Sequence, residues 1–386
     1  MQIYGMYLID KIASGGNRRN IDIFNSIAKI GVHVSVFVNE MFKDEFVGCN
    51  VEPIPIKLKK GKRVSVQIAK QLKKFLTQNK DRLFLKSTLN SGDSYIIVFN
   101  ETSWASSNVL KSFCGAKIIF AYRSDTVEAI KAFFKYEKIN VKDRIFFILQ
   151  YLITRYREKL IAKKASLIVF QSENDRKHFF ERNKDIKAKT TIIPNDVLQP
   201  RFKEEYKDKN KSTSCEHFLF VGSYDIRKGL IFFLKALLIV KEAGIPFNAT
   251  VLVTGKELPL ISNFVREHNL GSLIKFITNA KEVFPFMINH DILIVPSLFD
   301  SFPNVIMEAL HVGLPIFASN TSGMPYMLQN EKLLFEVANP DDIAKKLIDC
   351  ASNDDYYLEI KNLCHAQRKK FEFNWAQKWI SAIKEC

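Results

Sequence analysis

The chain has 386 residues, of which 47% are hydrophobic and 25% are charged, and this balance excludes a disordered chain and predicts two globular domains. Its formal net charge of +16 fits nucleic acid, an anionic membrane face or anionic substrates as partners, or a general excess of lysine without functional meaning. The six cysteines are scattered, which predicts free thiols in a reducing compartment. We find neither a signal peptide nor an apolar run approaching the ~20 residues of a membrane span, so we expect a cytoplasmic protein.

The N-terminal stretch predicts a βαβ unit. Residues 3–9 have the pattern of a buried strand, a glycine-rich loop contains Gly15-Gly16, a helix runs to about residue 30, and residues 31–38 form a second strand. The glycine pair lacks the three spaced glycines and the later acid of a dinucleotide site, so NAD binding is only weakly supported. Turn formation is the simplest explanation of these glycines.

Two further strands, at residues 94–100 and 117–122, continue the first domain. The second strand ends in Arg123-Ser-Asp125. Ligands of parallel α/β sheets bind beyond the carboxyl ends of strands, so Arg123 and Asp125 are candidate functional residues. The alternative is an ion pair between them on the surface.

The region Lys131–Lys164 alternates apolar and aromatic side chains with lysine and arginine. One interpretation is a pair of helices that face the core and have solvated basic sides. The other is a helix that lies on an anionic membrane, with its cations at the level of the headgroups.

The second domain begins after residues 201–216, a polar stretch without periodicity that we interpret as a linker. A buried strand, Phe218–Gly222, leads through Ser223 to the pair Arg227-Lys228, which precedes a helix. An ammonium group at this place is suited to a diphosphate. A solvated loop is the alternative.

The stretch at residues 291–315 organises the rest of the second domain. A buried strand ends at Pro296, a loop carries Asp300, and a helix with Pro303 in its first turn ends at Gly313. We expect the N-cap of this helix at residue 301 or 302. Asp300 and Glu308 then lie near one helix N-terminus, where amide groups bind anions. Phosphate oxygens for the amides and sugar hydroxyls for the carboxylates are both present in a nucleotide sugar, although two solvated acids are the simpler alternative.

The sequence Pro-Ser-Leu-Phe-Asp-Ser-Phe-Pro-Asn-Val-Ile-Met-Glu-Ala-Leu of residues 296–310, followed by Gly-Leu-Pro, resembles the donor signature of retaining GT-B glycosyltransferases, the "glycosyl transferases group 1" family (family 4-like). The family has two glutamates with seven residues between them, whereas Asp300 stands at the first position here. Ser223 replaces the usual arginine, while Lys228 matches the family lysine. Gly15-Gly16 and the Ile-Pro-Asn turn at residues 193–195 are also similar. Many members have a histidine near Arg123, and none stands there in this chain.

The resemblance implies an α/β protein with two Rossmann-like, doubly wound domains that face a cleft. Residues 1–198 would form the acceptor-side domain, 199–216 the linker, 217–370 the nucleotide-sugar-binding domain, and 371–386 a helix that packs back on the first domain. The implied activity is transfer of a sugar, with retention, from a nucleotide diphosphate sugar to a hydroxyl group of a glycan or lipid-linked glycan, as in bacterial surface polysaccharide synthesis. UDP is the commoner nucleotide in the family.

The resemblance also assigns roles to residues. Asp300, Lys228, Arg227, Arg123 and Asp125 are the expected catalytic residues. The expected donor site consists of Gly222, Ser223, Lys228, Gly255, Phe302, Pro303, Asn304, Val305 and Glu308. Gly15, Gly16 and Arg123 are expected on the acceptor side.

No cofactor or metal is expected, because the chain has no Asp-x-Asp pair to hold a divalent ion. Three alternatives stay open. These are an epimerase or phosphorylase with the same fold, a catalytically silent subunit that binds nucleotide sugar, and a nucleic-acid-binding protein, for which no module signature is present.

Overall fold

The structure is a computed structural model that describes residues 1–9, 15–46, 48–58, 65–81, 94–100, 103–136, 141–197 and 202–386. It divides into two compact units. Unit 1 consists of Met1–Val127, Asn140–Pro194 and Asn374–Cys386, and unit 2 of Glu128–Ile139 and Asn195–Phe373. None of the helices in the described ranges has the length and apolarity that crossing a bilayer requires.

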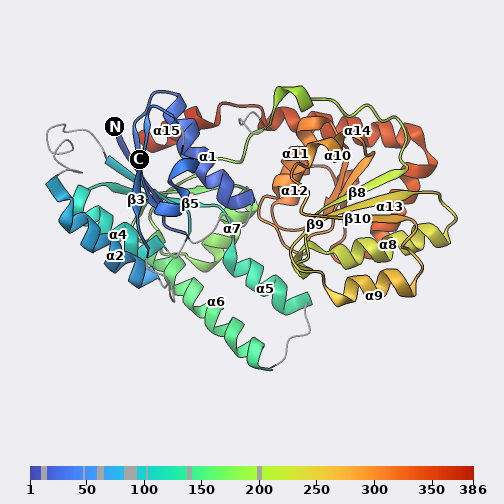
Figure 1. Ribbon diagram of the computed structural model, residues 1–386, viewed down its shortest axis with the longest axis horizontal. Coiled ribbons are helices and arrows are strands. Elements are labelled where there is room, and N and C mark those ends of the chain that lie inside the picture. Colours follow the sequence, from blue (N-terminus) through green and yellow to red (C-terminus); the bar gives the residue numbers. More distant parts are fainter. Residues whose placement is uncertain are drawn as a thin grey trace. The chain divides into compact units, whose positions relative to one another are not determined.

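Unit 1 is built on a parallel sheet of seven strands in the order β3-β2-β1-β4-β5-β6-β7 (Figure 1). Its strands are β1 (Gln2–Tyr7), β2 (Val34–Asn39), β3 (Val51–Ile56), β4 (Ser94–Val98), β5 (Lys117–Tyr122), β6 (Ala165–Phe170) and β7 (Lys189–Ile192). Its helices are α1 (Gly15–Lys29), α2 (Ser65–Gln78), α4 (Trp104–Cys114), α5 (Thr126–Tyr136, which continues into unit 2), α6 (Val141–Ala162), α7 (Glu173–Arg182) and α15 (Trp375–Lys384), with a short 3-10 turn, η1 (Glu40–Glu45).

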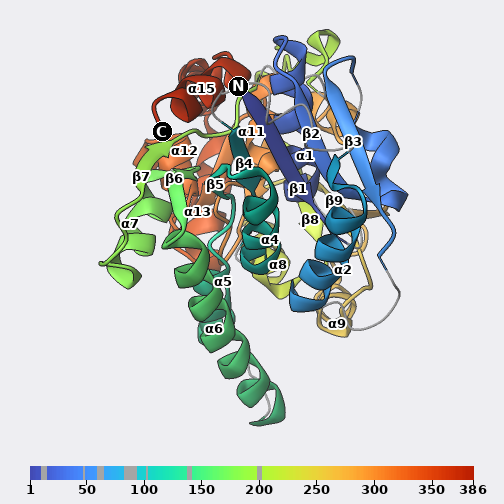
Figure 2. The same cartoon turned by 90° about the vertical axis from the view of Figure 1, so that its left-hand side faces the viewer.

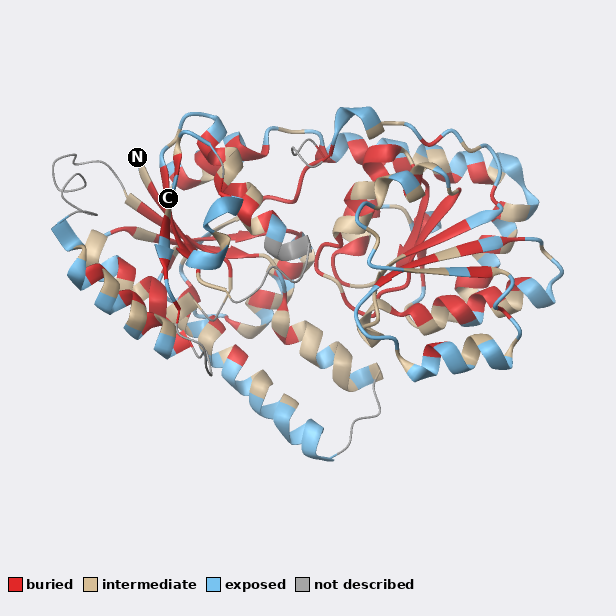
Figure 3. Cartoon of the chain, in the orientation of Figure 1, coloured by how far each residue is buried: buried red, intermediate tan, exposed pale blue. Residues whose placement is uncertain are grey.

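The central strands of unit 1 are apolar runs because helices cover both faces of a parallel sheet. All residues of β2 and nearly all of β1 are buried, as the red strands in Figure 3 show. Strand β3 and helix α4 are among the elements of this unit that are not predicted above. Strand β3 contains Pro53 and Pro55, which remove ladder donors and fit its position at the sheet edge. Helix α4 stands between β4 and β5.

Unit 2 has a parallel sheet of six strands in the order β10-β9-β8-β11-β12-β13. Its strands are β8 (His217–Ser223), β9 (Asn248–Thr254), β10 (Ile274–Thr278), β11 (Ile292–Val295), β12 (Ile316–Ser319) and β13 (Leu334–Phe335). Its helices are α8 (Leu230–Glu242), α9 (Pro259–Glu267), α10 (Phe284–Ile288), α11 (Asn304–Val312), α12 (Met324–Leu328), α13 (Pro340–Ser352) and α14 (Asp354–Arg368), with 3-10 turns η3 (Glu204–Tyr206), η4 (Ile226–Lys228), η5 (Glu331–Leu333) and η6 (Lys369–Phe371).

Residues 202–216, which we interpreted as a linker from their polarity, pack on unit 2. Asn210 is only 4% exposed, and its side-chain amide donates to the carbonyl oxygens of Met287 and His290 at 3.1 and 2.6 Å. Lys361 Nζ donates to the carbonyl oxygen of Ser212 at 2.6 Å. These polar side chains satisfy buried backbone groups, a use that composition alone does not reveal.

Both sheets reverse their strand order at one place. In unit 1 the chain winds from β1 to β3 in one direction and then resumes with β4 on the other side of β1. In unit 2 the same reversal lies between β8 and β11. Ligands of doubly wound α/β folds bind outside the carboxyl ends of the strands at such a switch point, so each unit has one position that is favoured for a ligand.

Candidate active site

The switch point of unit 2 brings together two of the residues predicted from the sequence. Lys228 follows β8 in the turn η4, and Asp300 follows β11 in the loop before α11. Strands β8 and β11 are neighbours in the sheet, with Phe218 paired to Ile292. Lys228 Nζ donates to Asp300 Oδ2 at 2.6 Å.

The turn that carries Lys228 is packed directly against the loop after β11. Gly229 has φ +70°, and a Cβ atom at this position would lie 1.8 Å from the carbonyl oxygen of Pro296. Only glycine fits both the left-handed backbone and the close approach. The amide of Leu298 donates to the carbonyl oxygen of Arg227 at 2.8 Å, so the two loops are fixed to each other on both sides of Lys228.

The Lys228–Asp300 ion pair is neither buried nor fully solvated. The exposed fractions of the two side chains are 23% and 17%. An ion pair of this kind can exchange partners, because its atoms remain accessible while part of their hydration has been removed. A phosphate group would compete with Asp300 for the ammonium group, and a sugar hydroxyl would compete with Lys228 for the carboxylate. The sequence assigned the two residues separate roles and did not indicate their contact.

Arg227, one of the expected catalytic residues, is paired locally. Asp225 caps η4 by accepting from the amide of Arg227 at 2.9 Å, and its second oxygen accepts from Arg227 Nη2 at 3.2 Å. The charge of Arg227 is therefore shared with Asp225 before any ligand arrives. Gly222 and Ser223, at the end of β8, are both half-buried.

Helix α11 presents its N-terminus at the same switch point. It begins at Asn304, and Pro303 is its N-cap with an extended backbone (φ −63°, ψ 120°). The N-cap predicted at residue 301 or 302 is therefore wrong by one or two positions, because Pro303 is not yet helical. Asn304 and Val305 form the first turn, where amide groups have no intrahelical acceptor. Glu308 lies four residues further on and is half-buried.

Gly323, which precedes α12, packs closely against the loop between β11 and α11. A Cβ atom on Gly323 would lie 1.6 Å from the carbonyl oxygen of Ser301, and the amide of Gly323 donates to the carbonyl oxygen of Asp300 at 3.2 Å. Phe302 is buried and contacts Phe371 edge-on, with ring centroids 6.0 Å apart. Gly255 has φ +94° and follows β9. The backbone around Asp300 is thus fixed by packing.

The predicted surface pair of Arg123 and Asp125 does not form. Asp125 is completely buried, and both of its oxygens accept from Arg182 Nη2 at 3.0 Å. Arg123 instead donates to the carbonyl oxygen of Ile193 at 3.2 Å, and its guanidinium carbon lies 5.7 Å from the ring centroid of Trp375. Both residues thus have structural partners, and their expected catalytic roles stay predictions.

Arg182 is the centre of a buried polar network. Its Nη2 atom also donates to Tyr122 Oη at 2.8 Å and to Glu158 Oε2 at 3.2 Å, and Tyr122 donates to the same Glu158 oxygen at 2.9 Å. Burial, with the nearby charges of Asp125 and Glu158, raises the pKa of Tyr122, so its hydroxyl remains a donor.

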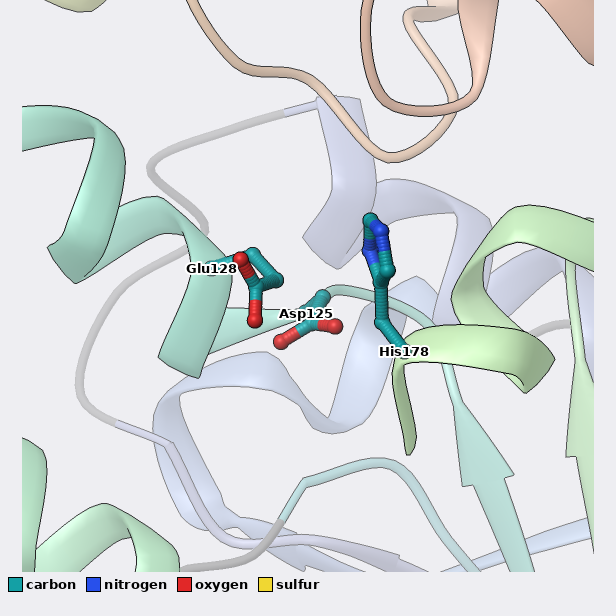
Figure 4. A group of neighbouring side chains, drawn as sticks. All are labelled: Asp125, Glu128 and His178. Atoms are coloured by element: carbon teal, nitrogen blue, oxygen red, sulfur yellow. The ribbon is translucent and has the colours of Figure 1, made fainter. Parts of the chain in front are cut away.

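Figure 4 shows Asp125 together with Glu128 and His178. One ligand atom from each of these side chains lies within 4.8 Å of the others. Asp125 directly precedes α5 and Glu128 lies in its first turn, so the two acids are close along the chain. Arg182 holds both oxygens of Asp125, and a cation would have to replace it. We therefore assign Asp125 to the buried network.

A small pocket lies at the switch point of unit 1. It is lined by the end of β1, the end of β4 and the adjacent helices, through Met6, Tyr7, Leu8, Ile9, Asn20, Ile68, Phe99, Asn100, Ser103 and Ser106. The polar side chains in this described lining are amides and hydroxyls. Mainly because of burial, the pKa of Tyr7 is raised, so its phenol stays neutral.

Sequence reasoning missed this neutral pocket, although Asn100 at the end of the predicted strand 94–100 was the available signal. Ser103 donates to Asn100 Oδ1 at 3.1 Å. Gly15 and Gly16, the expected acceptor-side pair, stand in the first turn of α1, and the preceding loop lies outside the described residues.

Comparison with known proteins finds relatives in sequence and in fold. Residues 215–353 match the sequence profile of the family described as Glycosyl transferases group 1. An uncharacterized glycosyltransferase of Haemophilus influenzae is 22% identical over 374 residues, which cover 94% of each chain. The UDP-Gal:alpha-D-GlcNAc-diphosphoundecaprenol alpha-1,3-galactosyltransferase of Escherichia coli is 25% identical over 221 residues, 54% of this chain and 57% of that relative. The chain spans about half the length of several of the curated relatives it matches.

Among solved structures, HepE of Anabaena in complex with UDP-glucose is similar over 100% of both chains, with a TM-score of 0.72 and 14% sequence identity. A likeness at this identity concerns the fold. The profile match lies within unit 2 and includes Lys228 and Asp300. Both findings confirm the family and the fold that the sequence resemblance implied. Residues 215–353 are therefore similar to the group 1 glycosyltransferases, and the chain has the GT-B fold, with two doubly wound parallel α/β sheets.

Proposed function

We propose that this glycosyltransferase moves a sugar from a UDP-sugar to a hydroxyl group of a glycan or lipid-linked glycan, with retention at the anomeric carbon, in the synthesis of a bacterial surface polysaccharide. The observation that carries the proposal is the Lys228–Asp300 pair at 2.6 Å, at the switch point where α11 begins. It combines a cation and helix amides for phosphate oxygens with a carboxylate for a sugar hydroxyl.

Several comparisons support the choice of substrates. The Escherichia coli relative is named for a UDP-galactose donor and a diphosphoundecaprenol-linked acceptor, and the HepE structure holds UDP-glucose. The neutral pocket in unit 1 suits the hydroxyl groups of a sugar, because amides and hydroxyls both donate and accept hydrogen bonds. A lipid-linked acceptor would bring the enzyme to a membrane surface.

In the proposed reaction, the bond between the anomeric carbon and the diphosphate breaks while the acceptor oxygen attacks from the same face. The departing phosphate oxygen accepts the proton of the acceptor hydroxyl. Lys228 and the first amides of α11 stabilise the negative charge that develops on the leaving group. Glu308 holds the ribose hydroxyls and Asp300 a hydroxyl of the transferred sugar. These groups neutralise the negative charge of the phosphates, so the proposed reaction requires no divalent ion.

The first test is a thermal-shift panel of nucleotide sugars. A ligand at ~100 times its dissociation constant stabilises the folded protein by ~2.7 kcal/mol, and we expect UDP-sugars to stabilise it more than GDP- or ADP-sugars. Transfer to a glycan acceptor is then measured with and without a chelator, and the rate should be retained. Loss of the rate, restored by Mg²⁺ or Mn²⁺, would refute metal independence.

The product distinguishes this function from its alternatives. Transfer yields a glycoside with the donor's anomeric configuration. A free epimerised sugar would indicate an epimerase with the same fold. Nucleotide-sugar binding without any product would indicate a silent subunit, an alternative that Asp300 and Ser223 keep open because both depart from the family pattern.

A further inference from the structure

Helix α6 exposes many apolar side chains and buries two polar ones together with Ile161 and Ala162. In its C-terminal half, Thr154 and Glu158 are buried against unit 1. Glu158 is only 2% exposed, and its carboxylate accepts from Tyr122 at 2.9 Å and from Asn183 at 2.7 Å. A charged residue that is fully hydrogen-bonded on the inner side fixes which face of the helix points outward.

The outward face of α6 is apolar. We call the following residues the α6 stripe: Val141, Ile145, Phe146, Ile148, Leu149, Leu152, Ile153 and Tyr156. Their exposed fractions run from 41% for Ile153 to 74% for Val141. Their spacing of three and four residues places them on one side of the helix. In Figure 3 the N-terminal half of α6 is largely exposed, and Figure 2 shows it extending beyond the other elements of unit 1.

Cations border the α6 stripe along its length. At about 100° per residue, Arg144 falls on one edge of the stripe and Arg157 on the other. Arg155 follows the edge of Arg144, but its Nη2 atom donates to the carbonyl oxygen of Arg182 at 3.2 Å. Lys142 is exposed near the N-terminal end. Asp143, the acid in the first turn of α6, falls on the opposite side of the helix.

The apolar stripe and the cations beside it indicate which kind of partner surface would bind α6. A contiguous apolar face is rarely left in water. Pairing of two copies through their stripes would bring the arginine edges together, and like charges repel. An anionic lipid surface complements both features, since its acyl boundary receives the apolar side chains and its headgroups receive the cations.

We propose that α6 lies flat on an anionic membrane, with the α6 stripe at the acyl boundary and its arginines among the headgroups. The proposal narrows the region Lys131–Lys164 to one face of one helix, because Phe133 and Phe134 of α5 are half-buried. Its use to the enzyme rests on the proposed function, which places a lipid-linked acceptor in the same membrane. Binding to lipid, however, is measured without any sugar transfer.

The test is flotation of the full chain with vesicles of phosphatidylcholine, alone or mixed with phosphatidylglycerol. We expect binding to the anionic vesicles only, and weaker binding as salt is raised. The double variant Leu149→Gln/Leu152→Gln should lower the partition coefficient at least about tenfold. The matched control is Leu260→Gln, because Leu260 on α9 is 55% exposed and lies outside α6.

Three results would overturn the proposal. These are no flotation of the wild type with either vesicle, equal flotation with both, or unchanged flotation of the double variant. If the wild type does not float but is a dimer in solution, and the double variant is a monomer, the stripe joins two copies instead. Transfer to a water-soluble acceptor, measured in parallel, separates failure of membrane binding from failure of the proposed function.

Discussion

The two units share one topology but carry different side chains at their switch points. Both are parallel sheets with a single switch point, between β1 and β4 in unit 1 and between β8 and β11 in unit 2. At the first lies a pocket whose described lining is neutral, with Asn100 and Ser103 among its polar groups. At the second, Lys228 and Asp300 form a partly exposed ion pair beside a helix N-terminus. The fold therefore provides two ligand positions, and the loops after the strands determine that one suits phosphate and the other suits hydroxyl groups.

The strongest test of this contrast is removal of the cation. Lys228→Ala should abolish most sugar transfer, since loss of one charge partner of a desolvated phosphate costs on the order of 2–5 kcal/mol. Steady-state kinetics with saturating acceptor measure the effect. Lys235→Ala is the matched control, because Lys235 is an exposed lysine on the following helix α8. A rate for Lys228→Ala within about threefold of wild type would place Lys228 outside the phosphate site.

Glu308→Gln should weaken every nucleotide ligand, whether or not it carries a sugar. A hydrogen bond to a charged group contributes about 1.5–3 kcal/mol, and the ribose is present in all donors. Calorimetric titration with UDP and with the UDP-sugar provides the measurement, and Glu331→Gln, an exposed glutamate in η5, is the control. Unchanged affinity for both ligands would remove Glu308 from the donor site.

Asp300→Asn should affect the sugar and spare the nucleotide. Transfer should fall about tenfold, the lower range for one charge-assisted hydrogen bond. Affinity for UDP should not fall, because the substitution releases Lys228 from the carboxylate that it now contacts. Asp341→Asn, on the exposed first turn of α13, is the control. If Asp300→Asn loses UDP as severely as Glu308→Gln, the two acids do not divide the donor as proposed.

The smallest effect is expected in unit 1. Ser103→Ala removes one neutral hydrogen-bonding group from the pocket and should raise the KM for the acceptor by the equivalent of about 0.5–1.5 kcal/mol. The affinity for UDP should stay the same. Ser112→Ala is the control, because Ser112 is an exposed serine on α4, the helix that Ser103 precedes. A change in UDP affinity without a change in the acceptor KM would contradict the assignment of this pocket to the acceptor.

Most of the fold could be predicted because buried parallel strands are continuous apolar runs. The predicted strand at residues 117–122 is β5 itself, and the helix after Asp300 is α11. Strand β3 was missed because its prolines obscure the strand pattern at a sheet edge, where they are tolerated. Helix boundaries also shifted, as with Pro303, because the backbone of a capping residue depends on its loop.

Sites are harder to predict than strands because they depend on strand order. The sequence placed Lys228 and Asp300 each after a strand, but their contact spans 72 positions and exists only because β8 and β11 are neighbours. For Asp125, a functional role was predicted for a residue that has a structural partner. A polar residue after a strand was interpreted as part of a ligand site, whereas Arg182 on α7 neutralises it inside the protein. Neither outcome follows from the residues adjacent in sequence.

The position of α15 has a consequence for biosynthesis. This helix belongs to unit 1, where it packs on α1 and buries Trp375 and Trp379. On the ribosome, residues 374–386 emerge only after all of unit 2, so unit 1 stays incomplete through most of translation. During that time the surface of α1 that α15 covers is open to chaperones and to neighbouring chains. A stop codon before residue 374 would therefore damage the N-terminal unit while leaving the donor-binding sequence intact.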